Sequence, residues 1–116
     1  MRKEEYKFPL EEYVSSRDFK KIKSFSRDKE TPFLIVDLEK VGKMYDQLVE
    51  NMPFVRIYYA VKANPMDEVI NVLKDKGSNF DAATIYEVDQ LLRLGIEPAR
   101  ISYGNTIKKE KDITYA

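Results

Sequence analysis

The chain has 116 residues, which corresponds to one domain of ordinary size at most. Hydrophobic residues make up 43% and charged residues 34%, and 20 basic residues balance 20 acidic ones, so neither disorder nor a nucleic-acid or anionic-membrane partner is indicated. Cysteine and histidine are both absent, which excludes disulfides, a Ser-His-Asp triad and Cys or His metal ligands within this chain.

Residues 1–30 are polar and charged, with scattered apolar residues. Residues 15–30, SSRDFKKIKSFSRDKE, predict a short helix followed by a loop, and we interpret the whole segment as a lead-in that docks at the periphery. Its first residues carry charges throughout and do not resemble a secretory signal. No run approaches the ~20 apolar residues of a spanning helix. We therefore expect a soluble, cytoplasmic protein.

From Thr31 the pattern changes, because residues 32–37, PFLIVD, form a short apolar run typical of a strand buried on both faces. Asp37 is a candidate N-cap for a following helix, in which Glu39 and Lys43 are spaced as an i,i+4 ion pair. Pro53 is expected to end that helix. The apolar positions that recur at helical spacing are Val41, Met44, Tyr45, Leu48 and Val49.

Residues 55–61, VRIYYAV, predict a second strand that ends at Lys62. We expect Asn64 to cap the next helix, with Pro65 in its first turn. Residues 79–83, NFDAA, predict a third strand, followed by the capping box Thr84-Ile85-Tyr86-Glu87 and a helix. Residues 100–104, RISYG, predict a fourth strand, after which KKEKDITYA begins another helix.

The predicted strands begin at nearly regular intervals, near residues 33, 56, 79 and 100. A repeating βα unit builds a parallel sheet, and the absence of a glycine-rich nucleotide loop favours a (β/α)8 barrel over a doubly wound sheet. A whole barrel needs about 250 residues. We therefore expect an α/β fold in which residues 31–116 form a partial TIM-type barrel of about four βα units. A half-barrel that pairs with another chain is the alternative.

Active sites of such barrels lie at the carboxyl ends of the strands, where the sequence places Lys62, Asp81 and Asn105. Strand alternation puts Tyr58, Ala60 and Lys62 on one face, and the small Ala60 leaves room beside the amine. A desolvated lysine amine attacks carbonyls to form a Schiff base, and pyridoxal phosphate is the cofactor that most often uses this link.

Structural roles compete with each of these assignments. From spacing alone, an ordinary charge that extends out of the barrel end is the simpler interpretation of Lys62. Asp81 is explained as well by a helix cap or a cation partner as by a cofactor role. The capping box explains Glu87 without chemistry, and Gly-Asn at Asn105 is first of all a turn. The tyrosine pair at 58–59 is most simply explained by strand packing.

Three segments in order resemble one known family: YYAVKANP (58–65), NFDAATIYEV (79–88) and PARISYGNTIKK (98–109). They are similar to motifs of the pyridoxal-phosphate decarboxylases with an alanine-racemase-like barrel, known as fold type III. These are the ornithine, lysine, arginine and diaminopimelate decarboxylases. The resemblance runs from about Thr31 to the last residue. It implies that residues 1–30 lead in from the family's second, β-rich domain.

The resemblance implies a role for each matching residue. Lys62 corresponds to the Schiff-base lysine, Asp81 lies near the cofactor ring, and Glu87 matches a glutamate near the active site. Ala60 belongs to the cofactor-binding strand. The implied reaction is decarboxylation of ornithine, or of lysine, to a diamine in polyamine biosynthesis, by a cytoplasmic homodimer that binds pyridoxal 5′-phosphate and a small amino-acid substrate.

The family also stacks a histidine on the cofactor ring, binds the phosphate through a glycine-rich loop and borrows a cysteine and an aspartate from the partner subunit. None of these is found here, so we interpret the chain as the N-terminal part of such an enzyme, inactive alone. The alternatives are a non-catalytic binding module, a diaminopimelate decarboxylase-like enzyme, a fragment that cannot fold alone and a small single-domain cofactor carrier.

Overall fold

The computed structural model describes residues 13–116, and any prediction that falls on residues 1–12 lies outside the described part. The chain divides into two compact units, Met1–Val36 and Asp37–Ala116, which are treated separately below. Over residues 13–116, no helix has the length and apolar character needed to cross a membrane.

In the first unit, helix α1 (Ser16–Ser26) confirms the helix predicted for residues 15–30. The hydroxyl of Ser15 accepts a hydrogen bond of 3.1 Å from the backbone N–H of Asp18, as an N-cap residue does. From residue 13 to residue 36 the described chain contains no strand. The assignment of residues 1–30 to a β-rich domain therefore stays a prediction.

The strand predicted for residues 32–37 is wrong, because this segment forms no ladder with any described strand. Leu34, at the centre of the run, is 82% exposed. A strand requires a hydrogen-bonded neighbour, and an apolar run indicates only that the residues favour burial.

The second unit begins with helix α2 (Leu38–Asn51), whose start and end follow the sequence signals. The Asp37 carboxylate accepts a 3.0 Å hydrogen bond from the Lys40 backbone N–H, and Glu39 pairs with Lys43 at 2.7 Å. The helix stops before Pro53, as predicted.

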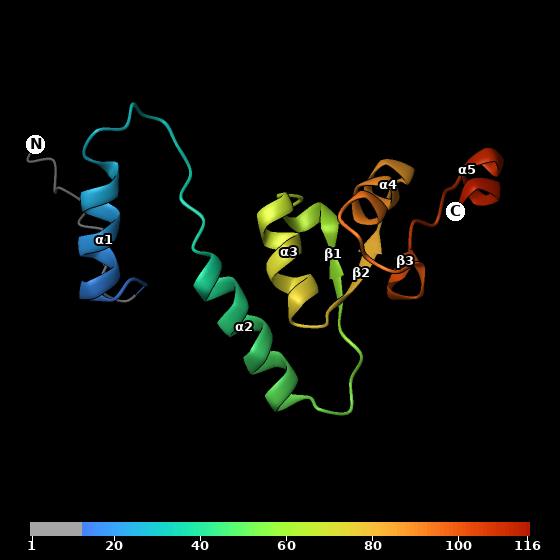
Figure 1. Ribbon diagram of the computed structural model, residues 1–116, viewed down its shortest axis with the longest axis horizontal. Helices are drawn as coiled ribbons and strands as arrows, with labels where there is room; N and C mark the ends of the chain where they lie inside the picture. The colour runs from blue at the N-terminus through green and yellow to red at the C-terminus, as the bar shows by residue number, and fades with distance from the viewer. Residues whose placement is uncertain (1–12) are drawn as a thin grey trace, which may run out of the picture. The chain divides into compact units, whose positions relative to one another are not determined.

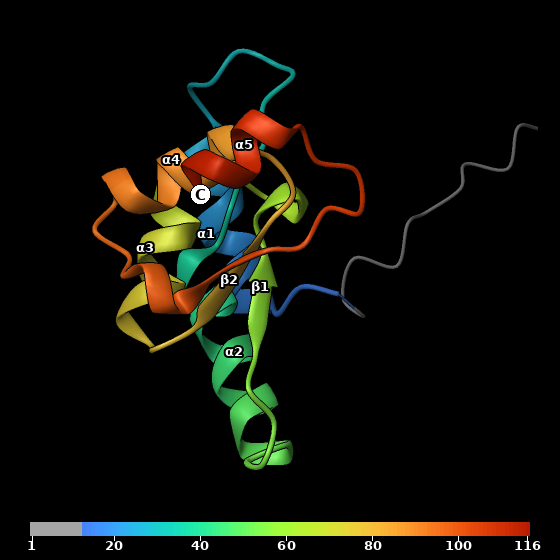
Figure 2. The same ribbon diagram turned by 90° about the vertical axis from the view of Figure 1, so that its right-hand side faces the viewer.

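A parallel sheet of three strands in the order β1-β2-β3 follows: β1 (Tyr58–Ala60), β2 (Asn79–Ala82) and β3 (Ile101–Tyr103). Helix α3 (Asp67–Asp75) connects β1 to β2, and α4 (Ile85–Arg93) connects β2 to β3. Figures 1 and 2 show α3 and α4 on the same side of the sheet, as right-handed crossovers require. The partial-barrel prediction thus holds with three strands instead of four.

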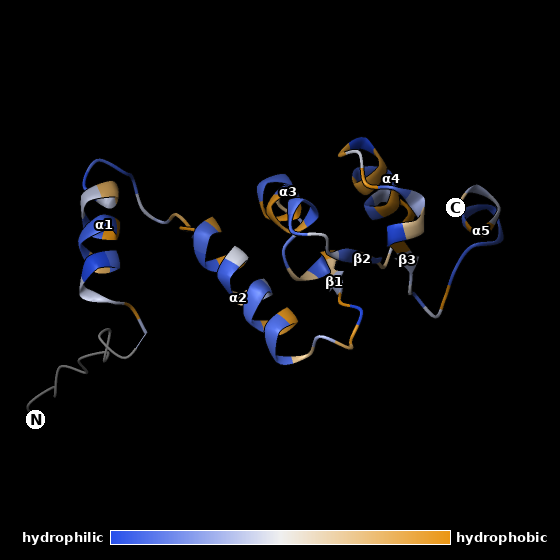
Figure 3. Cartoon of the chain, turned by 60° about the horizontal axis from the view of Figure 1, so that its bottom comes forward, coloured by the Kyte–Doolittle hydropathy of each residue, from blue (hydrophilic) through white to orange (hydrophobic). Residues whose placement is uncertain are grey.

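The core lies between this sheet and its helices. Phe80 is completely buried at the centre of β2, and its ring meets that of Tyr59 edge-on, with centroids 6.4 Å apart. Figure 3 shows apolar and polar stretches alternating along α2, α3 and α4, as amphipathic helices require. The other buried apolar residues are Val61, Val69, Ile70, Leu73, Ala82, Val88, Leu91 and Ile96.

Both crossover helices end at a glycine with positive φ, Gly77 at +88° and Gly95 at +75°. Each glycine N–H and the N–H after it bond back to carbonyls of the last turn, as in a Schellman motif. After α4, the short 3₁₀ turn η3 (Pro98–Arg100) leads into β3. The Arg100 guanidinium donates to the carbonyls of Ser78 and Lys74, which ties the start of β3 to the end of α3.

The predicted start of α3 is wrong by about two residues. The helix begins at Asp67, and neither Asn64 nor Pro65 belongs to it. The Asn64 side-chain oxygen accepts from the Met66 N–H at 3.1 Å, which makes a local turn and not a helix cap. Met66 still has an extended backbone (φ −61°, ψ 131°), so the first intrahelical bond reaches the Met66 carbonyl, and the Pro65 carbonyl instead accepts from the Gln90 side chain.

The final helix, α5 (Glu110–Tyr115), confirms the helix predicted after the fourth strand. The Tyr115 hydroxyl donates to the Asp89 carboxylate at 2.9 Å, which connects α5 to α4.

Candidate functional site

Lys62 lies just beyond the carboxyl end of β1, in the middle of a single 3₁₀ turn, η2 (Val61–Ala63). The prediction that Lys62 is the last strand residue is therefore wrong, and strand alternation with Tyr58 stops at Ala60. Val61 is completely buried, whereas Lys62 is exposed. The chain thus turns around a buried anchor and presents the lysine at the carboxyl edge of the sheet.

Asp81 lies on the neighbouring strand, as predicted. In the β1–β2 register it is the partner of Ala60, and in the β2–β3 register it is the partner of Ser102. Partners in a parallel ladder share a face, so these three side chains lie opposite the buried Phe80 and Ala82. The face that carries Asp81 is therefore the one that α3 and α4 leave uncovered.

The backbone of Gly104 approaches the Asp81 carboxylate closely at the end of β3. A Cβ built on Gly104 would collide with Asp81 Oδ1 and would lie 2.9 Å from Asp81 Cγ. The Gly104 N–H donates to the Ala82 carbonyl at 3.0 Å and so extends the ladder by one bond. The missing side chain at residue 104 therefore leaves space that the carboxylate occupies.

Glu87 and Asn105 take the structural roles that competed with chemistry in the sequence. The Thr84 hydroxyl accepts from the Glu87 N–H at 3.2 Å, and Glu87 Oε2 accepts from the Ala83 N–H at 2.5 Å. This confirms Thr84 as the cap of α4, whereas the return bond from Glu87 goes to the N–H one residue before the cap and not to that of Thr84. Asn105 Oδ1 accepts from the Ile107 N–H at 3.4 Å, which makes a turn.

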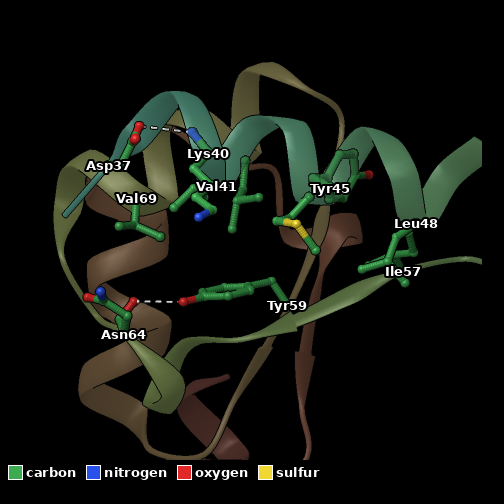
Figure 4. Close-up of a pocket in the computed structure, with 11 residues that line it drawn as sticks. Asp37, Lys40, Val41, Tyr45, Leu48, Ile57, Tyr59, Asn64 and Val69 are labelled. Carbon is green, nitrogen blue, oxygen red and sulfur yellow. Dashed lines mark hydrogen bonds between the residues drawn. The ribbon is translucent and has the colours of Figure 1, made fainter. Parts of the chain in front are cut away.

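The segment after Lys62 is held from the side of the sheet by Tyr59. Its hydroxyl donates to the Asn64 carbonyl at 3.1 Å, and Figure 4 shows the ring extending beneath α2 toward Asn64. Burial raises the pKa of the Tyr59 hydroxyl, and the hydrogen bond to Asn64 offsets part of that rise. Tyr59 thus remains a neutral donor across the physiological pH range.

Side chains of α4 also bond to this segment and to the start of α3. Gln90 Nε2 donates to the Pro65 carbonyl and to Asp67 Oδ1, both at 2.7 Å. Arg93 adds two bonds of 3.1 Å to the Asp67 carboxylate. The Arg93 guanidinium and then the Gln90 amide lower the pKa of Asp67. The sequence analysis missed these residues, because each bond joins positions more than 20 residues apart and no local pattern marks it.

A cavity of about 430 Å³ lies beneath α2, between it and β1 and α3. Tyr59 lines it, and Tyr59 shares a face of the sheet with Phe80. The cavity is therefore on the helix-covered side, opposite the face of Asp81, and is a packing space separate from the candidate site. Its other apolar lining residues are Val41, Met44, Tyr45, Leu48, Ile57, Val69 and Leu73.

Parallel strands joined by helices, with a lysine after one strand and a carboxylate on the next, are the arrangement found in part of a (β/α)-barrel domain. Residues 38–116 match the family model described as "Pyridoxal-dependent decarboxylase, pyridoxal binding domain". The chain belongs to this family. The family resemblance inferred from the three sequence motifs is thereby confirmed.

Curated relatives carry decarboxylase names. The chloroplastic ornithine decarboxylase of Nicotiana glutinosa is 41% identical over 90 residues, which are 78% of this chain and 21% of that protein. The lysine/ornithine decarboxylase of Selenomonas ruminantium is 33% identical over 97 residues, or 84% of this chain and 25% of that protein. The chain therefore spans about a fifth to a quarter of the length of these relatives.

Solved structures show the same fold. Lysine/ornithine decarboxylase from Vibrio vulnificus, complexed with cadaverine, gives a TM-score of 0.80 at 27% identity, over 87% of this chain and 28% of that one. The structure of SrLDC, a lysine decarboxylase, in complex with pyridoxal phosphate (PLP) and cadaverine gives a TM-score of 0.75 at 31% identity, over 86% of this chain and 26% of that one. The expectations of an N-terminal barrel part and of pyridoxal phosphate as the family's cofactor are confirmed.

Proposed function

We propose that this chain is the N-terminal part of a pyridoxal-phosphate-dependent decarboxylase that converts ornithine, or lysine, to the corresponding diamine. The observation that carries the proposal is the placement of Lys62 at the carboxyl end of β1, next to the strand whose exposed face bears Asp81. The names of the relatives, ornithine decarboxylase and lysine/ornithine decarboxylase, support the substrate class.

The donor groups at this edge fit the cofactor. Pyridoxal phosphate carries an aldehyde, and the exposed amine of Lys62 is the group that bonds to an aldehyde. Asp81 supplies a half-buried carboxylate one strand away, in the space that Gly104 leaves for it. Lys62 would hold the cofactor, with Asp81 near it, and Ala60, the ladder partner of Asp81, adds no bulk on that face.

When bound, pyridoxal phosphate supplies an electron sink that accepts the electron pair left by the departing carboxylate. The Nζ of Lys62 would act as a nucleophile toward the aldehyde when it is unprotonated, and it would take up a proton when the substrate amine displaces it. The fixed negative charge of Asp81 favours positive charge near it, on the amine or on a bound cation. The strand ladder fixes the position of this carboxylate.

Further parts of the proposal rest on the family resemblance. These are a homodimer, a cytoplasmic location and a place in polyamine biosynthesis. The division into residues 1–30 and a barrel domain at residues 31–116 is also part of it. The family match begins at residue 38, which supports a boundary between the lead-in and the barrel in this part of the chain.

The test is carbon dioxide release from ornithine and from lysine by the longer protein that contains this chain. We expect carbon dioxide release from at least one of the two amino acids and loss of that release in Lys62→Ala. The control, Lys21→Ala, removes an exposed lysine that is distant from Lys62 in sequence, and it should retain release. The 116-residue chain alone is expected to release none. Release from neither amino acid by the longer protein would overturn the proposed substrate class.

A further inference from the structure

The backbone that follows Lys62 is bonded to a side chain from a different βα unit. Gln90, on α4, donates through one amide nitrogen to the Pro65 carbonyl and to the Asp67 carboxylate, both at 2.7 Å. Pro65 is three residues after Lys62, and Asp67 is the first residue of α3. One half-buried amide thus fixes the junction between the lysine turn and α3.

The bond from Gln90 to the Pro65 carbonyl affects the position of the Lys62 amine, because the Lys62 side chain is exposed. An exposed lysine has many rotamers, so the position of its amine depends mainly on how well the backbone of its turn is fixed. Val61 anchors the turn by burial, and Tyr59 holds the Asn64 carbonyl from below α2, as Figure 4 shows. Gln90 adds a bond from α4 to the next carbonyl, that of Pro65.

Gln90 also links the two candidate site residues. Its helix starts directly after β2, the strand that carries Asp81, so the bond to Pro65 fixes the lysine turn relative to the carboxylate strand. Arg93 is one turn further along the same helix and bonds only to the Asp67 side chain. The two residues therefore share a partner, but only Gln90 reaches the backbone of the segment after Lys62.

We propose that Gln90 is a positioning residue that sets the location of the Lys62 amine relative to Asp81. The proposal rests on the proposed function of Lys62 as the cofactor-binding lysine. Its physical basis is that a neutral amide has two N–H donors, which serve a backbone carbonyl and a carboxylate together without adding charge.

The test compares three substitutions in the longer protein. Gln90→Met keeps the length of the side chain and removes both donors, Gln90→Lys restores a donor, and Arg93→Leu is the control that loses the Asp67 contact only. Gln90→Leu also lacks the donors and adds no charge beside Asp67, and it replaces the Met variant if that variant fails to fold.

Two quantities are measured. The first is the rate of amide hydrogen exchange over residues 61–66. The second is the share of the pyridoxal phosphate label that borohydride traps on Lys62, which peptide mass mapping gives. In Gln90→Met we expect amide exchange to quicken and the Lys62 share of the label to fall about fivefold, the ratio that loss of one net hydrogen bond typically produces. Gln90→Lys should recover most of both, and Arg93→Leu should resemble the unsubstituted protein.

Equal exchange and equal labelling in Gln90→Met and Arg93→Leu would overturn the proposal. Faster exchange in Gln90→Met would show that Gln90 stabilises the turn. If the unsubstituted protein is then not labelled at Lys62, the proposed function is overturned although Gln90 stabilises the turn. The two failures are therefore distinguishable.

Discussion

Lys62 owes its position to the residue before it and to the turn after it. Val61, the first residue after β1, is completely buried, and Lys62 follows it at the carboxyl edge of the sheet. Tyr59 and Gln90 then bond to the carbonyls of Asn64 and Pro65. A lysine placed in this way is exposed to a ligand, yet its backbone is fixed by packing and by hydrogen bonds from two other elements.

Asp67 gives a pH-dependent prediction at the same scale. Its bonds to Arg93 and Gln90 lower its pKa below the ordinary value of 3.8, so the unfolded state binds more protons when the pH lies between the two values. The stability from this cluster is complete above the ordinary pKa and is lost as the pH falls through the lowered one. Urea unfolding from about pH 6 to about pH 2 should therefore show a steeper loss of stability in the unsubstituted protein than in Asp67→Asn.

Arg93→Leu is the control for the Asp67 experiment, because it removes the first cause of the lowered pKa and should also flatten the profile. Parallel profiles for the unsubstituted protein and Asp67→Asn over the whole range would contradict the assigned role of Asp67.

At the scale of elements, α4 depends on a local cap. The Thr84 hydroxyl accepts from the Glu87 N–H at 3.2 Å, and the helix starts at the next residue, Ile85. Thr84→Ala should lower the free energy of unfolding by about 1 kcal/mol, whereas Thr84→Ser, which keeps the hydroxyl, should change it little. Chemical denaturation of both variants measures this, and equal losses in the two would show that the hydroxyl does not cap the helix.

Helix boundaries were predictable where their signals are local. The caps at Asp37 and Thr84 require only neighbouring residues, and both act as predicted. The start of α3 has no such local signal, because its N-cap, Met66, makes no side-chain capping bond, and the Pro65 carbonyl before it bonds to Gln90, 25 residues away in sequence.

Strands were harder to predict than helices, since each requires a partner. The run at residues 32–37 is as apolar as a buried strand but forms no ladder with the described strands. The predicted strand at residues 55–61 is reduced to β1, whose ladder partners are the three residues of β2 from Asn79 to Asp81. A pattern of hydrophobicity indicates which residues favour burial, but not which backbone will be paired.

For the site, the sequence identified the residue types and their order along the chain. Lys62 was selected at the end of one predicted strand and Asp81 on the next predicted strand, and the register brings the two strands together. The residues that support the turn were not identified. Gln90 forms bonds across more than 20 residues, and only the fold brings its amide to the Pro65 carbonyl.

At the scale of the whole molecule, the sheet has two free edges among residues 37–116. β2 is paired on both sides, whereas β1 and β3 each have one described neighbour. Unpaired strand edges promote association. We expect the 116-residue chain, expressed alone, to be oligomeric or aggregation-prone in sedimentation velocity. A monodisperse monomer with a cooperative thermal transition would contradict this expectation.

The central claim is that Lys62 is the lysine that binds pyridoxal phosphate. The most direct measurement is borohydride reduction of the longer protein after addition of the cofactor, followed by peptide mass mapping of every labelled lysine. The account predicts one dominant label, on Lys62, and its loss in Lys62→Arg without new labelling elsewhere. Label scattered over exposed lysines, or concentrated on a lysine other than Lys62, would contradict the account.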